Sequence, residues 1–143
     1  MNTAGFISGY RGSPLGTFDM NLWEAKAFLD ANHVRFEPGR LWCRATIREE
    51  LLTPFGNAHG GALAAIIDHV TGIVVYPLMK PGQWAATTEV KVNYIAPVQA
   101  GVVETESTVL AMTNRSAVVR GEIYFQGRLA CAAQGTLTIV DPK

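Results

Sequence analysis

The chain has 143 residues, of which 12 are basic and 12 are acidic, so its formal net charge is zero. A chain of this length can bury a sizeable hydrophobic core in one domain. The balanced charge excludes the broad basic surface of a nucleic-acid-binding protein, so we expect no nucleic-acid partner. The two cysteines, Cys43 and Cys131, lie far apart without metal-ligand spacing, which predicts free thiols in a reducing cytoplasm.

Residues 1–35 are predicted to form an irregular segment followed by a short helix. Residues 1–18 are rich in glycine, serine and proline, a composition typical of irregular structure. Asp19 or Asn21 can cap a helix that ends at about Ala31. The N-terminus lacks a basic start followed by an apolar run, so we expect no secretory signal.

Residues 36–141 are predicted to form one domain that begins with a hairpin and a helix. The hairpin joins strands at about 34–36 and 41–47. A long apolar helix is predicted over about 60–78. Its length would suffice to cross a membrane, but Asp68 near its middle would cost about 3 kcal/mol there. We therefore expect a buried core helix and no membrane partner.

Strands dominate the second half of the domain. Residues 88–94 alternate with period two, and three further strands follow, separated by tight turns at 113–115 and 126–128. A central helix followed by four long antiparallel strands predicts an α+β fold in which the sheet wraps the helix. The three further strands span 102–112, 116–125 and 129–140. Four tryptophan and tyrosine residues of the domain are interpreted as packing residues rather than walls of an acyl pocket: Trp42, Tyr76, Trp84 and Tyr94.

The motif His59-Gly60-Gly61 predicts a tight turn that enters the helix. The first N–H groups of a helix have no partner within it, so they can hold an oxyanion. Asp68 carries a carboxylate on an otherwise apolar stretch, and we expect it to be at least half-buried. A carboxylate is rarely buried unless a partner or a function accounts for it. An anion hole and a desolvated carboxylate together predict an acyl-transfer site.

The spacing of this pair predicts a dimer. Eight residues separate Gly60 from Asp68, which is roughly 12 Å along a straight helix and too far for both to touch one reacting carbonyl. If both are catalytic, a second copy of the chain supplies one of them, with the two helices antiparallel across a two-fold axis. His69 lies on a different helix face from Asp68, and we expect it to be structural or at the dimer seam.

This arrangement resembles the hotdog-fold thioesterases of the phenylacetic-acid-degradation and 4-hydroxybenzoyl-coenzyme A type. The likeness covers residues 36–141 and rests on three stretches. The first is Leu52-Thr53-Pro54-Phe55-Gly56, and the second is the His59-Gly60-Gly61 motif with Asp68 nine residues after the histidine. The third is the stretch 87–97, in which Tyr94 precedes Pro97. The resemblance implies a hotdog fold, with a long central helix wrapped by an antiparallel sheet of five to six strands. It also implies a homodimer that pairs into a homotetramer.

The resemblance implies hydrolysis of acyl- or aroyl-coenzyme A thioesters to the free acid and coenzyme A, without a cofactor or metal. The Gly60 N–H would polarise the thioester carbonyl, and Asp68 would act as general base or as nucleophile. Thr87 would help to place Asp68 or water. His59 would orient the turn rather than transfer protons.

Other residues would bind substrate by the same resemblance. Thr53, Asn57 and Gly61 are the expected contacts, although members often carry asparagine at the position of Thr53, which leaves the role of that residue open. Four cations are candidates for contacts to the coenzyme A phosphates, for which arginine is well suited, although a single residue of this kind is more often a solvated charge at a strand edge or turn: Lys91, Arg115, Arg120 and Arg128.

Two other functions stay open. His59 and Asp68 can pose as the pair of a hotdog dehydratase or hydratase that acts on 3-hydroxyacyl or enoyl thioesters. A non-catalytic acyl-coenzyme A-binding module is the third class. Residues 1–39, with Ala4 to Gly16 and on to Phe36-Glu37-Pro38-Gly39, resemble the N-terminus of indolepyruvate ferredoxin oxidoreductases, but the chain has no cysteine cluster to hold their iron. We interpret these residues as a borrowed segment.

Overall fold

The computed structural model describes residues 31–143, so the irregular segment and the helix expected from Asp19 or Asn21 lie outside the described residues. The domain boundary at residue 36 stays a prediction. The described elements follow one another in the order β1 Ala31–Glu37, β2 Arg40–Ile47, η2 Glu49–Leu51, α3 Gly60–Ile73, η3 Tyr76–Leu78, β3 Trp84–Tyr94, β4 Gly101–Met112, β5 Ser116–Phe125 and β6 Arg128–Val140.

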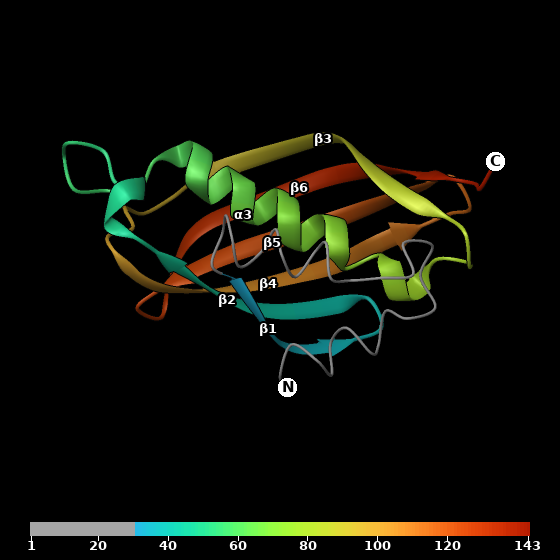
Figure 1. The fold of residues 1–143 in the computed structure, drawn as a ribbon, viewed down its shortest axis with the longest axis horizontal. Coiled ribbons are helices and arrows are strands. Elements are labelled where there is room, and N and C mark those ends of the chain that lie inside the picture. Colours follow the sequence, from blue (N-terminus) through green and yellow to red (C-terminus); the bar gives the residue numbers. More distant parts are fainter. Residues whose placement is uncertain (1–30) are drawn as a thin grey trace.

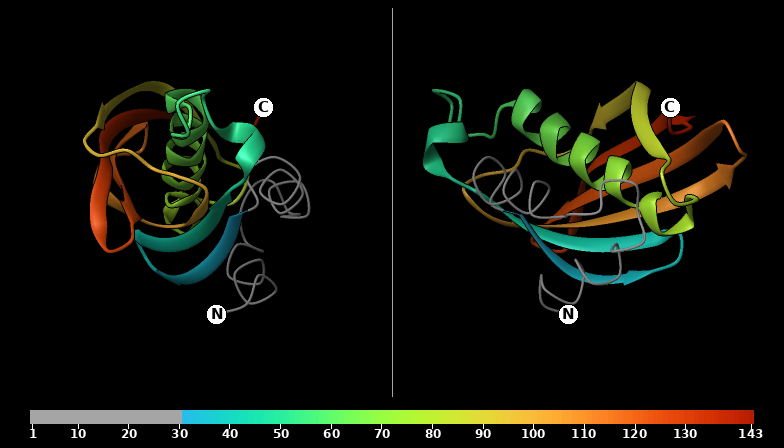
Figure 2. Two further views of the ribbon diagram at one scale, coloured as in Figure 1. Left: turned by 90° about the vertical axis from the view of Figure 1, so that its left-hand side faces the viewer. Right: turned by 45° about the vertical axis from the view of Figure 1, so that its right-hand side comes forward.

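The strands form one six-stranded sheet in the order β1-β2-β4-β5-β6-β3, in which all neighbours are antiparallel. The sheet curls around α3, which lies along its concave side (Figures 1 and 2). This arrangement confirms the expected α+β hotdog fold. Because β1 and β3 end the strand order, each has one edge without a neighbouring strand among residues 31–143.

The turns explain why the strands meet in this register. β5 and β6 are joined by Gln126 and Gly127, whose φ angles are 52° and 75°. Two residues with positive φ form the kind of hairpin turn whose twist matches that of the strands. In the turn between β4 and β5, the Thr113 N–H donates to the Ser116 carbonyl at 2.8 Å. The expected tight turns are therefore confirmed.

The helix is shorter than expected from the sequence. α3 ends at Ile73, and the chain continues through Val74 into the short 3-10 helix η3. Pro77 explains the break, because it has no N–H and its ring would clash with the carbonyl of Ile73. The segment Gly60–Leu78 is long and apolar enough to cross a membrane by length and composition, yet half of its most apolar stretch is buried within the structure.

One face of α3 packs tightly on β4 and β5. Ile67 and Val70 are fully buried. The Ser107 hydroxyl of β4 donates to the Val70 carbonyl at 3.0 Å, which pins the helix to the sheet. On β5, a Cβ added at Gly121 would lie 2.9 Å from the Thr71 Cγ2 atom. A glycine is therefore needed at this point for the helix to approach the sheet.

A β-bulge lies in the edge strand β3. Thr87 pairs with Leu137 and Glu89 with Thr136, so Thr88 is the extra residue. Since directly opposed residues share a face, Thr87 turns to the same face as the buried Leu137, which is the face that carries α3. Strict alternation from Val90 would instead have placed Thr88 there. The periodicity of the sequence does not reveal this shift.

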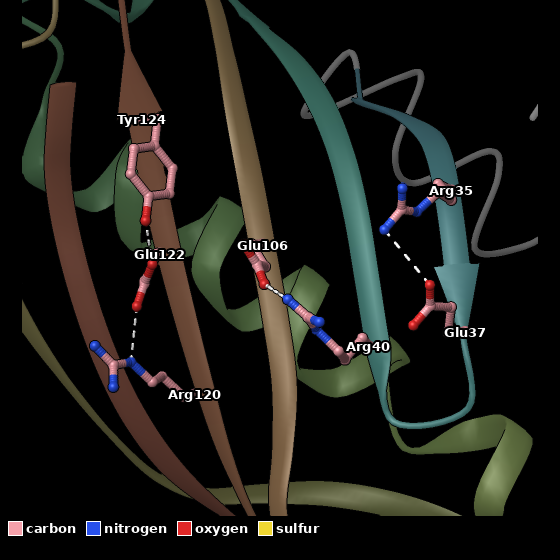
Figure 3. Close-up of polar contacts among 7 residues, drawn as sticks. All are labelled: Arg35, Glu37, Arg40, Glu106, Arg120, Glu122 and Tyr124. Carbon is pink, nitrogen blue, oxygen red and sulfur yellow. Dashed lines mark hydrogen bonds and ion pairs between the residues drawn. The ribbon is translucent and has the colours of Figure 1, made fainter. Parts of the chain in front are cut away.

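The outer face of the sheet is charged (Figure 3). Arg40 contacts Glu106, and the Arg120 Nε atom lies 2.8 Å from a Glu122 carboxylate oxygen. The Tyr124 hydroxyl donates to Glu122, and this hydrogen bond is the main reason that its pKa rises to about 12. Exposed pairs of this kind contribute at most about 1 kcal/mol each. They define a solvated surface on the side of the sheet opposite α3.

We expect Gly121→Ala to destabilise the fold by about 1–3 kcal/mol, because the new methyl group would overlap the Thr71 methyl group. Denaturant unfolding measures this loss. Thr71→Ser removes Cγ2 and keeps the hydroxyl that donates to Ile67, so the double variant should regain part of the stability. Simple additivity of the two losses would contradict the contact.

Candidate active site

The start of α3 is held by hydrogen bonds from the chain that precedes it. The Ala58 N–H donates to the Val98 carbonyl at 2.7 Å, and the His59 N–H donates to the Leu51 carbonyl at 2.9 Å. Val98 belongs to the segment after β3, and Leu51 ends η2. The turn is thus fixed from two sides.

Two N–H groups at the helix start lack a backbone partner. The Ala62 and Leu63 N–H groups both donate to the His59 carbonyl, at 3.0 and 3.3 Å. Within residues 31–143, no backbone carbonyl accepts from Gly60 or Gly61. These two residues begin the helix, where N–H groups have no acceptor inside it. They are the donors that can hold an oxyanion.

His59 shapes this turn through its backbone. It is the N-cap residue of α3, but its side chain makes no capping hydrogen bond. Its imidazole is exposed. Its N–H and carbonyl groups are the parts that contact Leu51 and the first helical turn.

A groove of about 390 Å³ opens beside the helix start. Asn57, Gly60 and Leu63 line one part of it, and Tyr94 and Ile95 line another. Tyr94 is 54% exposed. Tyr94 thus does more than pack, because its ring also forms a wall of the groove.

The groove contains Asn57 but not Thr53. The Asn57 carboxamide accepts a hydrogen bond from the Gln99 Nε2 atom at 3.0 Å. Thr53 closes the preceding loop, since its N–H donates to the Asn57 carbonyl at 2.7 Å and its hydroxyl accepts from the Phe55 N–H at 3.3 Å. The Thr53 hydroxyl thus stabilises the loop that presents Asn57.

Asp68 is exposed in the single chain, so the expectation that it is at least half-buried there is wrong. The carboxylate lies on the face of α3 that is turned away from the sheet. At 100° per residue, its neighbours on that face are small residues, namely Gly61, Ala64, Ala65 and Gly72. A Cβ added at Gly61 or Gly72 would meet nothing within 4 Å. Asp68 and Gly61 are exposed in this strip, and Ala64, Ala65 and Gly72 are partly buried.

Thr87 shares the helix-bearing face of the sheet, and it is exposed. Seven residues of β3 separate it from Tyr94, which contacts Gly60. At the rise of a strand this is about 20 Å. Gly60 and Thr87 of one chain therefore cannot reach one reacting carbonyl.

His69 is partly buried beside Asp68. Burial lowers the pKa of its imidazole to about 4, although the Asp68 carboxylate opposes this shift. A partly buried histidine with so low a pKa is neutral at pH 7. It therefore acts as a packing residue of the helix in the single chain.

The two cysteines of the chain are buried. Burial raises the pKa of the Cys43 thiol to about 12 and that of Cys131 to about 11, so neither is a thiolate at neutral pH. No group of three histidine, cysteine or carboxylate side chains within residues 31–143 could hold a metal ion.

The four candidate cations lie away from the groove, since none of them lines it. Lys91 and Arg120 border a separate hollow of about 310 Å³ that also includes Gln134. Arg120 is already paired with Glu122. Arg115 and Arg128 lie next to the turns that flank β5.

Among residues 31–143, the helix start thus presents two N–H groups without a backbone acceptor beside a groove, and such donors suit the oxyanion of an acyl-transfer reaction. The chain belongs to the thioesterase superfamily, whose family model matches residues 55–132, more than half of the chain. The protein is a thioester hydrolase.

Three similar proteins illustrate this kinship. The proofreading thioesterase EntH of Klebsiella pneumoniae is 28% identical over 109 residues, which cover 76% of this chain and 80% of that protein. The 1,4-dihydroxy-2-naphthoyl-CoA hydrolase of Listeria monocytogenes is 23% identical over 107 residues, which cover 74% and 87%. A hypothetical thioesterase of Streptococcus pneumoniae, solved with coenzyme A, shares the fold with a TM-score of 0.81, at 22% identity and coverage of 89% and 99%.

We expect the stability of the fold to fall as the pH drops from about 6.5 to about 4. Between these pH values, His69 is protonated in the unfolded chain but neutral in the folded protein, so protons favour the unfolded state. The effect is at most about 3 kcal/mol. His69→Gln should flatten this part of the curve of unfolding free energy against pH, whereas His59→Gln, at an exposed site, should leave the slope in place. An unchanged slope in His69→Gln would contradict the assignment.

Proposed function

We propose that the enzyme hydrolyses acyl- or aroyl-coenzyme A thioesters at a site shared by two copies of the chain. The observation that carries this proposal is the pair of free N–H groups at Gly60 and Gly61, which lies beside the groove. A thioester carbonyl that enters the groove meets these donors at the positive end of the helix dipole.

The N–H groups stabilise the charge that develops on the carbonyl oxygen when the thioester is attacked. A single donor of this kind is typically worth about 3 kcal/mol in the transition state. Asp68 of the second copy activates water as general base or attacks the carbonyl directly. The thiolate of coenzyme A leaves and takes up a proton. Where water attacks, the acid is formed at once; where Asp68 attacks, a mixed anhydride forms and water then hydrolyses it to release the acid and restore Asp68.

Two features of the single chain support a dimer. The face of α3 that is turned away from the sheet carries small residues around Asp68, so a second helix can approach it closely. The edge strand β3 has 11 residues and, within residues 31–143, a side without a neighbouring strand, and such an edge invites pairing with another chain. In a dimer that covers α3, Asp68 would lose water and become the desolvated carboxylate that the chemistry requires.

Two of the similar proteins support coenzyme A thioesters as the substrate class. One relative is named as a hydrolase of an aroyl-coenzyme A, and one structural neighbour was solved with coenzyme A. The groove suits such a ligand, because Leu63 and Ile95 provide apolar walls and Asn57 provides a polar amide. We further propose that dimers pair into tetramers and that the enzyme works in the cytoplasm, where its buried free thiols, Cys43 and Cys131, stay reduced.

A substrate panel tests the reaction. Release of free thiol from aryl, short-chain, medium-chain and long-chain acyl-coenzyme A esters is the expected result, with one class hydrolysed faster than the others. Loss of the enoyl absorbance of an enoyl-coenzyme A without thiol release would instead show a hydratase. Tight binding without turnover would show a binding module.

Asp68→Asn should lower kcat by about 100-fold or more while the protein stays folded, because the amide cannot take a proton or attack. Thiol release and a thermal melt measure the two properties. A folded and fully active Asn variant would contradict the role of the carboxylate.

Mixed dimers test whether the site is shared. Asp68→Asn chains keep Gly60, and Gly60→Ala chains keep Asp68. Refolding an equal mixture should restore about a quarter of the wild-type rate, since half of the dimers are mixed and each of these holds one intact site. Activity equal to the mean of the two parent variants would show that each chain works alone.

A further inference from the structure

Tyr94 ties the strand β3 to the start of the helix. Its hydroxyl donates to the Gly60 carbonyl at 2.9 Å. Its ring also packs on Gly60, because a Cβ added there would lie 3.1 Å from the Tyr94 Cζ atom. Polar and steric contacts thus join the same two residues.

The hydrogen bond acts on the peptide group between Gly60 and Gly61. In a trans peptide the carbonyl and the N–H lie in one plane and point in opposite directions. A donor that fixes the Gly60 carbonyl therefore fixes the direction of the Gly61 N–H. It also polarises the peptide, which makes that N–H a stronger donor.

We propose that Tyr94 is a positioning residue for catalysis, and that through it the Gly61 N–H becomes a second oxyanion donor beside that of Gly60. This inference rests on the proposed function of the groove. Tyr94 does not need to touch the reacting atoms. It acts through the Gly60–Gly61 peptide.

The position of Tyr94 is well fixed by the sheet. Tyr94 pairs with Cys131 on β6, and the Ile95 N–H donates to the Ala130 carbonyl at 2.7 Å. The sheet therefore holds the tyrosine in place, and the tyrosine holds the first peptide of the helix. Preorganised donors of this kind need no rearrangement when charge develops on the substrate.

The same contact explains why position 60 is a glycine. Gly60 does not have a positive φ, so its backbone conformation is open to other residues. The restriction comes from the ring of Tyr94, which would have to shift by a few tenths of an ångström to admit a Cβ at position 60. Gly60 and Tyr94 are thus coupled, because a side chain at position 60 would displace the tyrosine ring.

Tyr94→Phe tests the proposal, because it removes the hydroxyl and keeps the ring. We expect kcat to fall by about tenfold with little change in KM, since the lost orientation affects the charged transition state more than the bound substrate. The melting temperature should change little. Tyr124→Phe is the matched control, because it removes a hydrogen-bonded hydroxyl from the outer face of the sheet, and it should keep the wild-type kcat.

The Gly61 amide gives a readout that does not depend on turnover. In a ¹H–¹⁵N spectrum of Tyr94→Phe, the Gly61 amide proton should shift upfield, because its peptide is less polarised. In Tyr124→Phe it should stay in place. Unchanged kcat together with an unchanged Gly61 resonance would overturn the proposal while leaving the hydrolase function intact.

Two further outcomes distinguish the positioning role of Tyr94 from direct substrate binding and from failure of the proposed function. A rise in KM without a fall in kcat would show that the hydroxyl binds substrate directly, and it would also overturn the positioning role. If the wild-type enzyme hydrolysed no thioester, the proposed function would fail. The Gly61 resonance would then decide alone whether Tyr94 orients the peptide.

Discussion

The burial of one face of α3 against the concave sheet is the contact on which the rest of the structure depends. Ile66, Ile67 and Val70 are at most 2% exposed, and each such side chain stabilises the fold by about 1.5–3 kcal/mol. This contact fixes the helix axis relative to the strands. The groove exists because the helix starts at one end of that axis, beside the end of β3.

The chemistry follows from what the fold leaves unpaired. The backbone groups around the helix start find partners in Leu51 and Val98, and His59 accepts the next two N–H groups. The Gly60 and Gly61 N–H groups lack a backbone acceptor among the described residues. An unpaired N–H group is costly when it is buried in a core. At the wall of a groove, the same group can stabilise an anionic transition state. The site is thus a consequence of how the helix begins.

Much of this was predictable from the sequence. The alternation of β3 to β6 and the turn at Gln126-Gly127 predicted the sheet, and the motif predicted the helix start. The length of the helix was overestimated, because apolar composition continues past the point where Pro77 interrupts the hydrogen bonds. Asp68 looked buried in the sequence, since a single chain does not show which helix face a sheet leaves open.

Two features could not be predicted, because they depend on contacts between distant segments. The bulge at Thr88 follows from the pairing of β3 with Gly135 and Thr136 on β6, and no local pattern marks it. The contact of Tyr94 with Gly60 joins residues 34 positions apart. A tyrosine in a strand is typical of packing, so only the fold reveals its second role.

Tyr94 belongs at the same time to the wall of the groove and to the free edge strand of the sheet. A partner that pairs along the edge of β3 contacts the strand that holds this peptide, so assembly and ligand binding act on the same part of the structure. By thermodynamic linkage, the free energy that assembly contributes to ligand binding equals the free energy that the ligand contributes to assembly. Coupling of this kind would make the oligomer tighter when its substrate is abundant and looser when the substrate is scarce.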